Sequence, residues 1–227
     1  MPPRILAFDT SGPHIAVAMW PNKTAPTFVE MARGQAERLM TACEDKLAAE
    51  DLSFQDLDAV AVGVGPGNFT GIRIGVSAAR GLALALGIPA VGVTGFEMLH
   101  QGQSWSARVM LALPAPRDQA YVQTFVHGRP INVPSLTTIG EREPALEHPN
   151  LLVAGYRADE IATAYNAAWD LDVWTDSDPS MTAATLGLIA SNKLNDQSGA
   201  WSERPSPLYI KPADAAPSPH QAPTILK

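Results

Sequence analysis

The chain has 227 residues, 46% of them apolar, with 16 Lys and Arg against 23 Asp and Glu and a formal net charge of −7. This negative net charge argues against a protein that binds nucleic acid by itself, because phosphate binding needs clustered Lys and Arg. The single cysteine, Cys43, excludes an intramolecular disulfide. No apolar run reaches the about 18 residues of a membrane span, so a globular cytoplasmic protein is expected.

The first hundred residues alternate between strand and helix patterns. Strands are predicted at residues 4–9, 14–20, 27–31, 59–64 and 89–94, and helices at 35–50 and 69–86. The apolar positions switch from the two-residue period of strands to the helical period at residue 35. Helices intervene between the later strands, so we expect parallel pairing there and one compact α/β unit.

The second half has weaker patterns. Strands are predicted at 107–113, 119–126 and 151–155, and helices at 158–168 and 181–194. We place a boundary near residues 95–107, which gives an N-terminal lobe over 1–100 and a smaller second lobe over 101–211. The segment 212–227 is rich in Pro and Ala, and a mobile tail is expected there.

A glycine-rich stretch, GPGNFTGIRIG, covers residues 65–75 after an apolar strand. A Walker A loop needs a lysine, and the chain has none between Lys46 and Lys193. The glycine spacing is G-x-G-x-x-x-G, one residue longer than the dinucleotide-binding fingerprint. The two specific phosphate motifs are thus excluded, and Asn68 is predicted to be the N-cap of the following helix.

The predicted helix 69–86 is apolar on nearly every side, which is typical of a helix covered on two faces. Small residues, Gly71 and Gly75 among them, allow another helix to approach closely. The partner is either the helix 35–50 of the same chain or a second protein subunit. Arg73 opposes the helix dipole and predicts a nearby anion.

Catalytic signals are sparse. The five histidines have no metal-binding spacing, and no G-x-S-x-G motif is present. Cys43 lies on an apolar helical face and is predicted to be a buried structural thiol. The best polar cluster is Asp9-Thr10-Ser11, which either meets phosphate or hydrated Mg²⁺ or closes a hairpin through local hydrogen bonds.

Four stretches together resemble one known family: ILAFDTS, AERLMTACEDKL, DLDAVAVGVGPGNFTGIRIGVSAARGLALALGIPAVGVTGFEML and PLYIKPADA. They are similar to TsaB, also called YeaZ, from residue 4 to about 99 and again over 207–213. The resemblance implies an α/β, two-lobed actin/Hsp70-like (ASKHA) fold with mixed sheets flanked by helices. It also implies a non-catalytic subunit of the machinery that forms N6-threonylcarbamoyladenosine at position 37 of tRNAs reading ANN codons.

The resemblance further implies partners. TsaD, the catalytic paralogue, is expected to bind through helices 35–50 and 69–86, and the ATPase TsaE to bind the heterodimer. Without TsaD, homodimers are expected through the same helices, and tRNA is reached only through the complex. The implied interface residues are Leu39, Met40, Cys43 and Leu47 of the first helix and Gly71, Arg73, Gly75, Ala78 and Leu82 of the second.

The family also suggests what the polar cluster does. Asp9, Thr10 and Ser11 correspond to the phosphate loop of the superfamily and are the candidate cofactor residues. This chain itself is expected to need no cofactor and to hold no metal, since it lacks the metal-binding histidine pair of TsaD. ATP or ADP with Mg²⁺ at the interface of the complex is left open.

The chain departs from the family pattern at three positions. Asn68 replaces the usual Ser, Gln35 replaces a common His that could serve the partner contact, and Pro114 stands in a second-lobe segment that lacks its Asp. Two enzymatic alternatives are kept: a glycoprotease-like peptidase that acts on its paralogue and a weak stand-alone ATPase. The missing nucleophile system and phosphate lysine argue against them.

Overall fold

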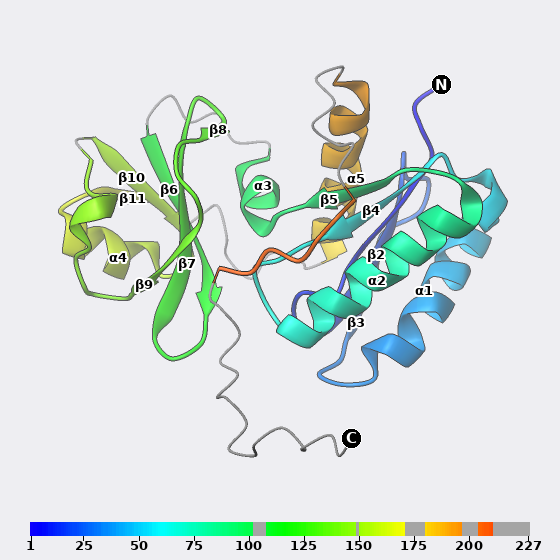
Figure 1. The fold of residues 1–227 in the computed structure, drawn as a ribbon, viewed down its shortest axis with the longest axis horizontal. Helices are drawn as coiled ribbons and strands as arrows, with labels where there is room; N and C mark the ends of the chain where they lie inside the picture. The colour runs from blue at the N-terminus through cyan, green and yellow to red at the C-terminus, as the bar shows by residue number, and fades with distance from the viewer. Residues whose placement is uncertain (102–107, 149, 171–179, 197–203, 211–227) are drawn as a thin grey trace, which may run out of the picture.

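A computed structural model describes residues 1–101, 108–148, 150–170, 180–196 and 204–210, and it contains two mixed β-sheets (Figure 1). The first sheet has the strand order β3-β2-β1-β4-β5. Strand β1 pairs antiparallel with β2 and parallel with β4, and β5 extends the parallel part. The bounds are β1 Ile5–Asp9, β2 His14–Trp20, β3 Thr27–Glu30, β4 Ala59–Gly63 and β5 Ala90–Val93.

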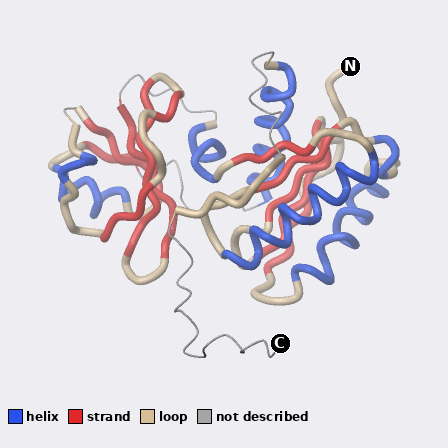
Figure 2. The backbone as a smooth tube through the Cα atoms, in the orientation of Figure 1, coloured by secondary structure: helices blue, strands red, loops and turns tan. Residues whose placement is uncertain are grey.

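Helices cover both faces of the first sheet (Figure 2). On one face lie α1, Gln35–Ala49, and α2, Phe69–Leu86, and on the other lies α5, Ser180–Asn195. Strand β1 shows why both faces are apolar: Leu6 and Phe8 join the core under α1 and α2, while Ile5 and Ala7 join the core under α5. Strands buried on both faces are continuously apolar rather than alternating, as β1 and β4 of this sheet are.

The ends of α2 follow from its capping residues. The Asn68 side chain accepts hydrogen bonds from the backbone N–H groups of Thr70, at 3.1 Å, and Gly71, at 3.4 Å, so the predicted N-cap is confirmed. The helix ends at Gly87, whose φ of 69° favours glycine. By length and composition alone α2 could cross a membrane, but helices in globular cores pass the same test, and Ile72 of α2 is buried in the core.

The second sheet has the order β11-β10-β6-β7-β8, with β9 paired to β7. Helix α4, Ala158–Tyr165, packs on it through buried Ile161 and Ala162. The strand bounds are β6 Arg108–Ala115, β7 Gln119–Val126, β8 Arg129–Pro130, β9 Ser135–Thr138, β10 Leu151–Gly155 and β11 Ala168–Asp170, and short 3-10 turns lie at Phe54–Asp56 and Pro144–Leu146.

Two segments join the lobes. Helix α3, Gly95–His100, places Met98 in the first-lobe core and Phe96 in the second-lobe core. The segment 204–210, which we call the C-terminal strap, runs between the lobes (Figure 1). Its Leu208 donates its backbone N–H to the carbonyl of Val64 at 2.9 Å and packs against both cores.

The predicted assignment of all residues 101–211 to the second lobe needs two corrections. Helix α5 packs on the first sheet, where Leu186 and Ile189 are buried with strand residues. The C-terminal strap also returns to the first lobe. Helix α5 has apolar residues that fit the open face of the first sheet, and sequence order alone does not show this long-range contact. The predicted tail, 212–227, lies outside the described residues.

Candidate functional site

The polar cluster at the end of β1 is held together by hydrogen bonds within the chain. Asp9 is buried, and its Oδ2 accepts a hydrogen bond from Ser11 Oγ at 2.8 Å. Nε2 of His14 lies 3.0 Å from the same oxygen. The other oxygen, Oδ1, is buried with no hydrogen-bond partner among the described residues. The local side-chain closure of the hairpin, one of the two interpretations that the sequence leaves open, is therefore present.

The side chain of Thr10 connects the turn after β1 to helix α2. It is fully buried, and its Oγ1 donates to the backbone carbonyl of Gly71 at 2.7 Å. This bond fastens the turn after β1 to the first turn of α2. The buried Thr10 hydroxyl is therefore not available to a ligand. Of the three candidate cofactor residues, Asp9 and Ser11 line a cavity and Thr10 does not.

That cavity, which we call the interlobe cleft, has a volume of about 830 Å³ and lies between the two lobes. Its first-lobe wall includes Asp9, His14 and Glu30, and its second-lobe wall includes Leu113 and Tyr121. Two carboxylates lie on this lining, while no lysine or arginine of the described residues does.

The residues of the interlobe cleft argue against a nucleoside triphosphate. Polyphosphates are held by cations, by backbone N–H groups at a helix N-terminus or by a bound Mg²⁺. The two carboxylates of the lining repel phosphate, and the Asn68 side chain already occupies N–H groups at the start of α2. Among the residues that the structure describes, no group of three or more His, Cys, Asp or Glu side chains could hold a metal ion.

The cleft also lacks an activated nucleophile among its described residues. In Ser-His-Asp hydrolases, the serine hydroxyl bonds to the imidazole, which in turn bonds to the carboxylate. Here Ser11 and His14 both point to one oxygen of Asp9, so the imidazole takes no proton from the serine. Cys43 is fully buried, and burial raises its pKa to about 12. The predicted burial of this thiol is confirmed.

The predicted interface residues divide into two groups. Arg73 is exposed, and Met40, Ala78 and Leu82 are partly exposed. The other five are buried inside this chain: Leu39, Cys43, Leu47, Gly71 and Gly75. Cys43, Leu47, Gly71 and Gly75 therefore offer no surface to a second subunit, and their assignment to the interface is corrected. Leu39 is also buried, but it lines a surface groove.

The two glycines of α2 serve a close approach within the chain. A Cβ at Gly71 would lie 1.9 Å from the backbone oxygen of Thr10, and a Cβ at Gly75 would lie 2.6 Å from Thr10 Oγ1. The predicted close approach is real, but it brings α2 onto the turn after β1 rather than onto a second subunit. A Gly75→Leu change would therefore disturb the core, and a loss of partner binding in this variant would not show that Gly75 contacts the partner.

The outer side of the helix pair carries an open groove, which we call the α1/α2 groove. It has a volume of about 490 Å³ and is lined by Ala36, Leu39, Met40, Phe69, Thr70, Arg73, Ile74, Ser77 and Ala78. Sequence reasoning missed Phe69, which is 40% exposed, and Leu84 of α2, which is 83% exposed. Their place on the polar side of α2, in line with Arg73 and Ser77, was the signal that could have revealed them.

Arg73 lines this groove and lies against aromatic rings. Its Nε donates to the hydroxyl of Tyr209 at 2.7 Å, and its guanidinium carbon lies 3.7 Å from the centre of the Phe69 ring. The anion predicted beside Arg73 is not found among the described residues. Tyr209 was not predicted as a site residue, although it lies in the PLYIKPADA stretch.

Two departures from the family pattern find structural explanations. The side-chain amide of Gln35 donates to the carbonyls of Gly12, at 2.8 Å, and His14, at 2.7 Å, and is buried. It therefore stabilises the turn after β1 and does not reach a partner surface. Pro114 lies on β6 opposite Ala120 and lines the interlobe cleft.

Comparison with known proteins agrees with this architecture. A family model described as TsaD, tRNA N6-adenosine threonylcarbamoyltransferase, matches residues 28–129. The TsaB protein of Escherichia coli K12 is 36% identical over 122 residues, which are 52% of this chain and 53% of that protein. The chain thus spans about half the length of this TsaB relative. An uncharacterised protein of Mycobacterium bovis is 31% identical over 220 residues, 94% of each chain.

Two solved structures share the fold. A protein of Pseudomonas aeruginosa described as similar to peptidase YeaZ has a TM-score of 0.68 at 24% identity, covering 92% of this chain and 100% of that one. YeaZ of Pseudomonas aeruginosa has a TM-score of 0.64 at 24% identity, over 91% and 99% of the two chains. The predicted α/β fold, with mixed sheets flanked by helices, is confirmed, and these two structures share it. On these matches, the chain belongs to the TsaB (YeaZ) family.

Proposed function

We propose that this chain is a non-catalytic subunit of the machinery that forms N6-threonylcarbamoyladenosine in tRNA, and that it acts by binding TsaD through the α1/α2 groove. The modification is the one at position 37 of tRNAs that read ANN codons. The observation that carries the proposal is the exposed apolar groove between α1 and α2, whose lining includes the exposed Phe69, together with the exposed Leu84 further along α2.

The physical argument is that an uncovered apolar surface favours association. Leu84, near the end of α2, is 83% exposed, and exposed apolar patches with a polar rim mark interaction sites. The groove lies between two helices, so a helix or helix pair of the partner can pack its ridges into it. This geometry suits a protein better than a small molecule, which a concave and more closed site would surround.

The absence of catalysis in this subunit is inferred from the interlobe cleft. Its carboxylates disfavour phosphate, and its serine and histidine do not form a nucleophile–base pair. The remaining steps belong to partners: TsaD carries the chemistry, TsaE joins the pair, and tRNA is held by the assembly in the cytoplasm. A net charge of −7 supports the view that tRNA binding by this chain alone is weak.

The test is the mass of the complex by light scattering after size exclusion, with this chain alone and mixed with TsaD of the same organism. We expect a homodimer that exchanges into a heterodimer. Ser77→Arg fills the groove at an exposed position and should abolish the heterodimer. Thr163→Arg makes the same kind of change at an exposed position of α4, away from the groove, and should leave it intact.

Two results would refute the proposal. One is that this chain forms no complex with TsaD at micromolar concentrations. The other is a Ser77→Arg variant that binds TsaD as tightly as the Thr163→Arg control. Cleavage of TsaD during incubation would instead favour the peptidase alternative, and heat released on mixing with ATP and Mg²⁺ would favour the ATPase alternative.

A further inference from the structure

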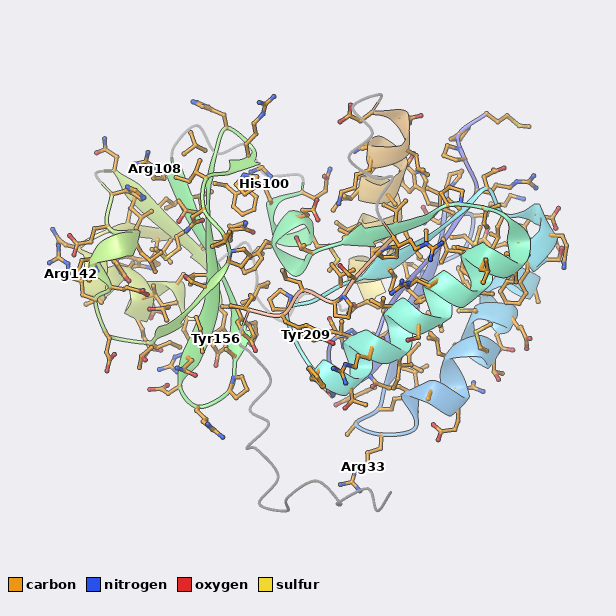
Figure 3. All side chains as sticks on the ribbon, in the orientation of Figure 1. Arg33, His100, Arg108, Arg142, Tyr156 and Tyr209 are labelled. Atoms are coloured by element: carbon orange, nitrogen blue, oxygen red, sulfur yellow. The ribbon has the colours of Figure 1, made fainter. Side chains whose placement is uncertain are left out.

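Three exposed side chains from distant parts of the sequence form one cluster at the start of α2. Phe69 and Arg73 come from α2, and Tyr209 lies 136 residues beyond Arg73 in the sequence. Tyr209 belongs to the C-terminal strap, where Figure 3 labels it. The Phe69 and Tyr209 rings lie 5.1 Å apart, and the guanidinium of Arg73 stacks on the first and is hydrogen-bonded to the second. A cation over an aromatic face is stabilised by the ring quadrupole.

The stacked guanidinium still has unused donors. Arginine carries five N–H donors in a planar fork, and among the described contacts only Nε is engaged, by Tyr209. The ion pairs found among the described residues involve other basic side chains, and none includes Arg73. The two terminal nitrogens are therefore open, in the geometry that binds both oxygens of one carboxylate.

The residues around the Arg73 guanidinium indicate which chemical group would pair with it. Helix α2 carries two arginines, Arg73 and Arg80, both exposed, and no acidic residue between Phe69 and Leu86. Arg73 also lines the apolar α1/α2 groove. A complementary surface therefore has an apolar ridge that fills the groove and a carboxylate that faces Arg73.

We propose that Arg73 is the docking residue for an Asp or Glu carboxylate of the partner protein, and that Phe69 and Tyr209 hold its guanidinium ready for this contact. The inference rests on the proposed function, since the partner is the protein that fills the α1/α2 groove. A guanidinium already fixed by two rings loses less side-chain freedom on binding. The C-terminal strap thus contributes a positioning residue to the interface of helix α2.

The test is calorimetric titration of TsaD into the wild-type chain and three variants, at low and high salt. Arg73→Gln should raise the dissociation constant about 10- to 100-fold, in the range of interface hot spots. Tyr209→Phe keeps the ring and removes only the hydroxyl, so a rise of about two- to fivefold is expected. Arg129→Gln makes the same charge change on exposed β8 of the second lobe and should bind as the wild type does.

The salt dependence separates a charge contact from a merely structural effect. Added salt should weaken wild-type binding, and it should weaken Arg73→Gln binding less, because the screened ion pair is already missing. Melting temperatures should agree across the variants, since Arg73, Tyr209 and Arg129 are all exposed.

The outcomes distinguish this inference from the function on which it rests. If the wild type does not bind TsaD, both are wrong. If the wild type binds and Arg73→Gln binds equally well with the same salt dependence, only the docking role of Arg73 is wrong. Loss of the homodimer in Arg73→Gln with unchanged TsaD binding would assign the contact to a second copy of this chain and would also refute it.

Discussion

A single methyl group added at two glycines of α2 should have opposite effects on stability. A Cβ at Gly71 would lie 1.9 Å from the backbone oxygen of Thr10 and 3.1 Å from the side-chain oxygen of Gln35. Because the first of these atoms belongs to the backbone of a buried turn, it cannot move aside cheaply. Gly81 lies about three helical turns further along α2. It is exposed, and a Cβ there meets nothing within 4 Å.

The magnitudes follow from three effects. Replacing a helical glycine by alanine stabilises by about 1 kcal/mol when space is available. Overpacking at Gly71 costs about 1–3 kcal/mol, and weakening the Thr10–Gly71 hydrogen bond costs about 1 kcal/mol more. We therefore expect Gly71→Ala to lose about 1–3 kcal/mol net, while Gly81→Ala gains about 0.5–1 kcal/mol.

The assay is thermal unfolding followed by far-ultraviolet circular dichroism, which reports on helix. For a chain of this size each kcal/mol shifts the melting temperature by about 2–4 °C. Gly71→Ala should therefore melt about 2–12 °C below the wild type, and Gly81→Ala about 1–4 °C above it. Equal shifts of the same sign in the two variants would refute the assignment of Gly71 to the close approach on Thr10.

Three further predictions concern single side chains. Asn68→Ala should lose about 1 kcal/mol in urea unfolding, because the N-cap of α2 is removed. Cys43, whose pKa burial raises to about 12, should react with a thiol reagent at mildly alkaline pH only after unfolding, and fast labelling of the native protein would contradict this. Burial raises the pKa of Glu50, but hydrogen bonds from Thr24 and neighbouring groups outweigh it and hold that pKa below its ordinary value. A carboxyl group whose pKa is lower in the folded state than in the unfolded state stabilises the folded protein at a pH above its unfolded-state pKa. This stabilisation is lost as the pH falls through the folded-state pKa. Glu50→Gln should therefore flatten the loss of stability below a pH of about 4, measured by urea unfolding across the acidic range.

Much of the first lobe was predictable because its signals are local. The bounds of α2 were predicted as Phe69–Leu86 and are found there, since Asn68 and Gly87 supply strong start and stop signals. Helix α3 was missed because it is short, although its capping box of Thr94 and Glu97 was present in the sequence. The packing of α5 on the first sheet depends on contacts across the chain, which no local pattern encodes.

The candidate interface was predictable only in part, for a geometric reason. A helix that is apolar on nearly all sides gives no contrast between its inner and outer faces. The small residues Gly71 and Gly75 were therefore assigned to a partner, although they face Thr10. The cluster around Arg73 could not be predicted because its Tyr209 comes from a segment 136 residues away.

The two faces of α2 are mechanically connected, and this explains why its inner glycines matter to a surface that they do not touch. Gly71 and Gly75 let the helix lie directly on the turn after β1, where Thr10 Oγ1 fixes the carbonyl of Gly71. A helix held this closely cannot roll, so the direction in which Phe69 and Arg73 point is set by the core. Substitutions on the inner face should therefore lower both stability and TsaD binding, whereas Arg73→Gln should lower binding alone. Measuring both quantities on each variant separates the inner face from the outer one.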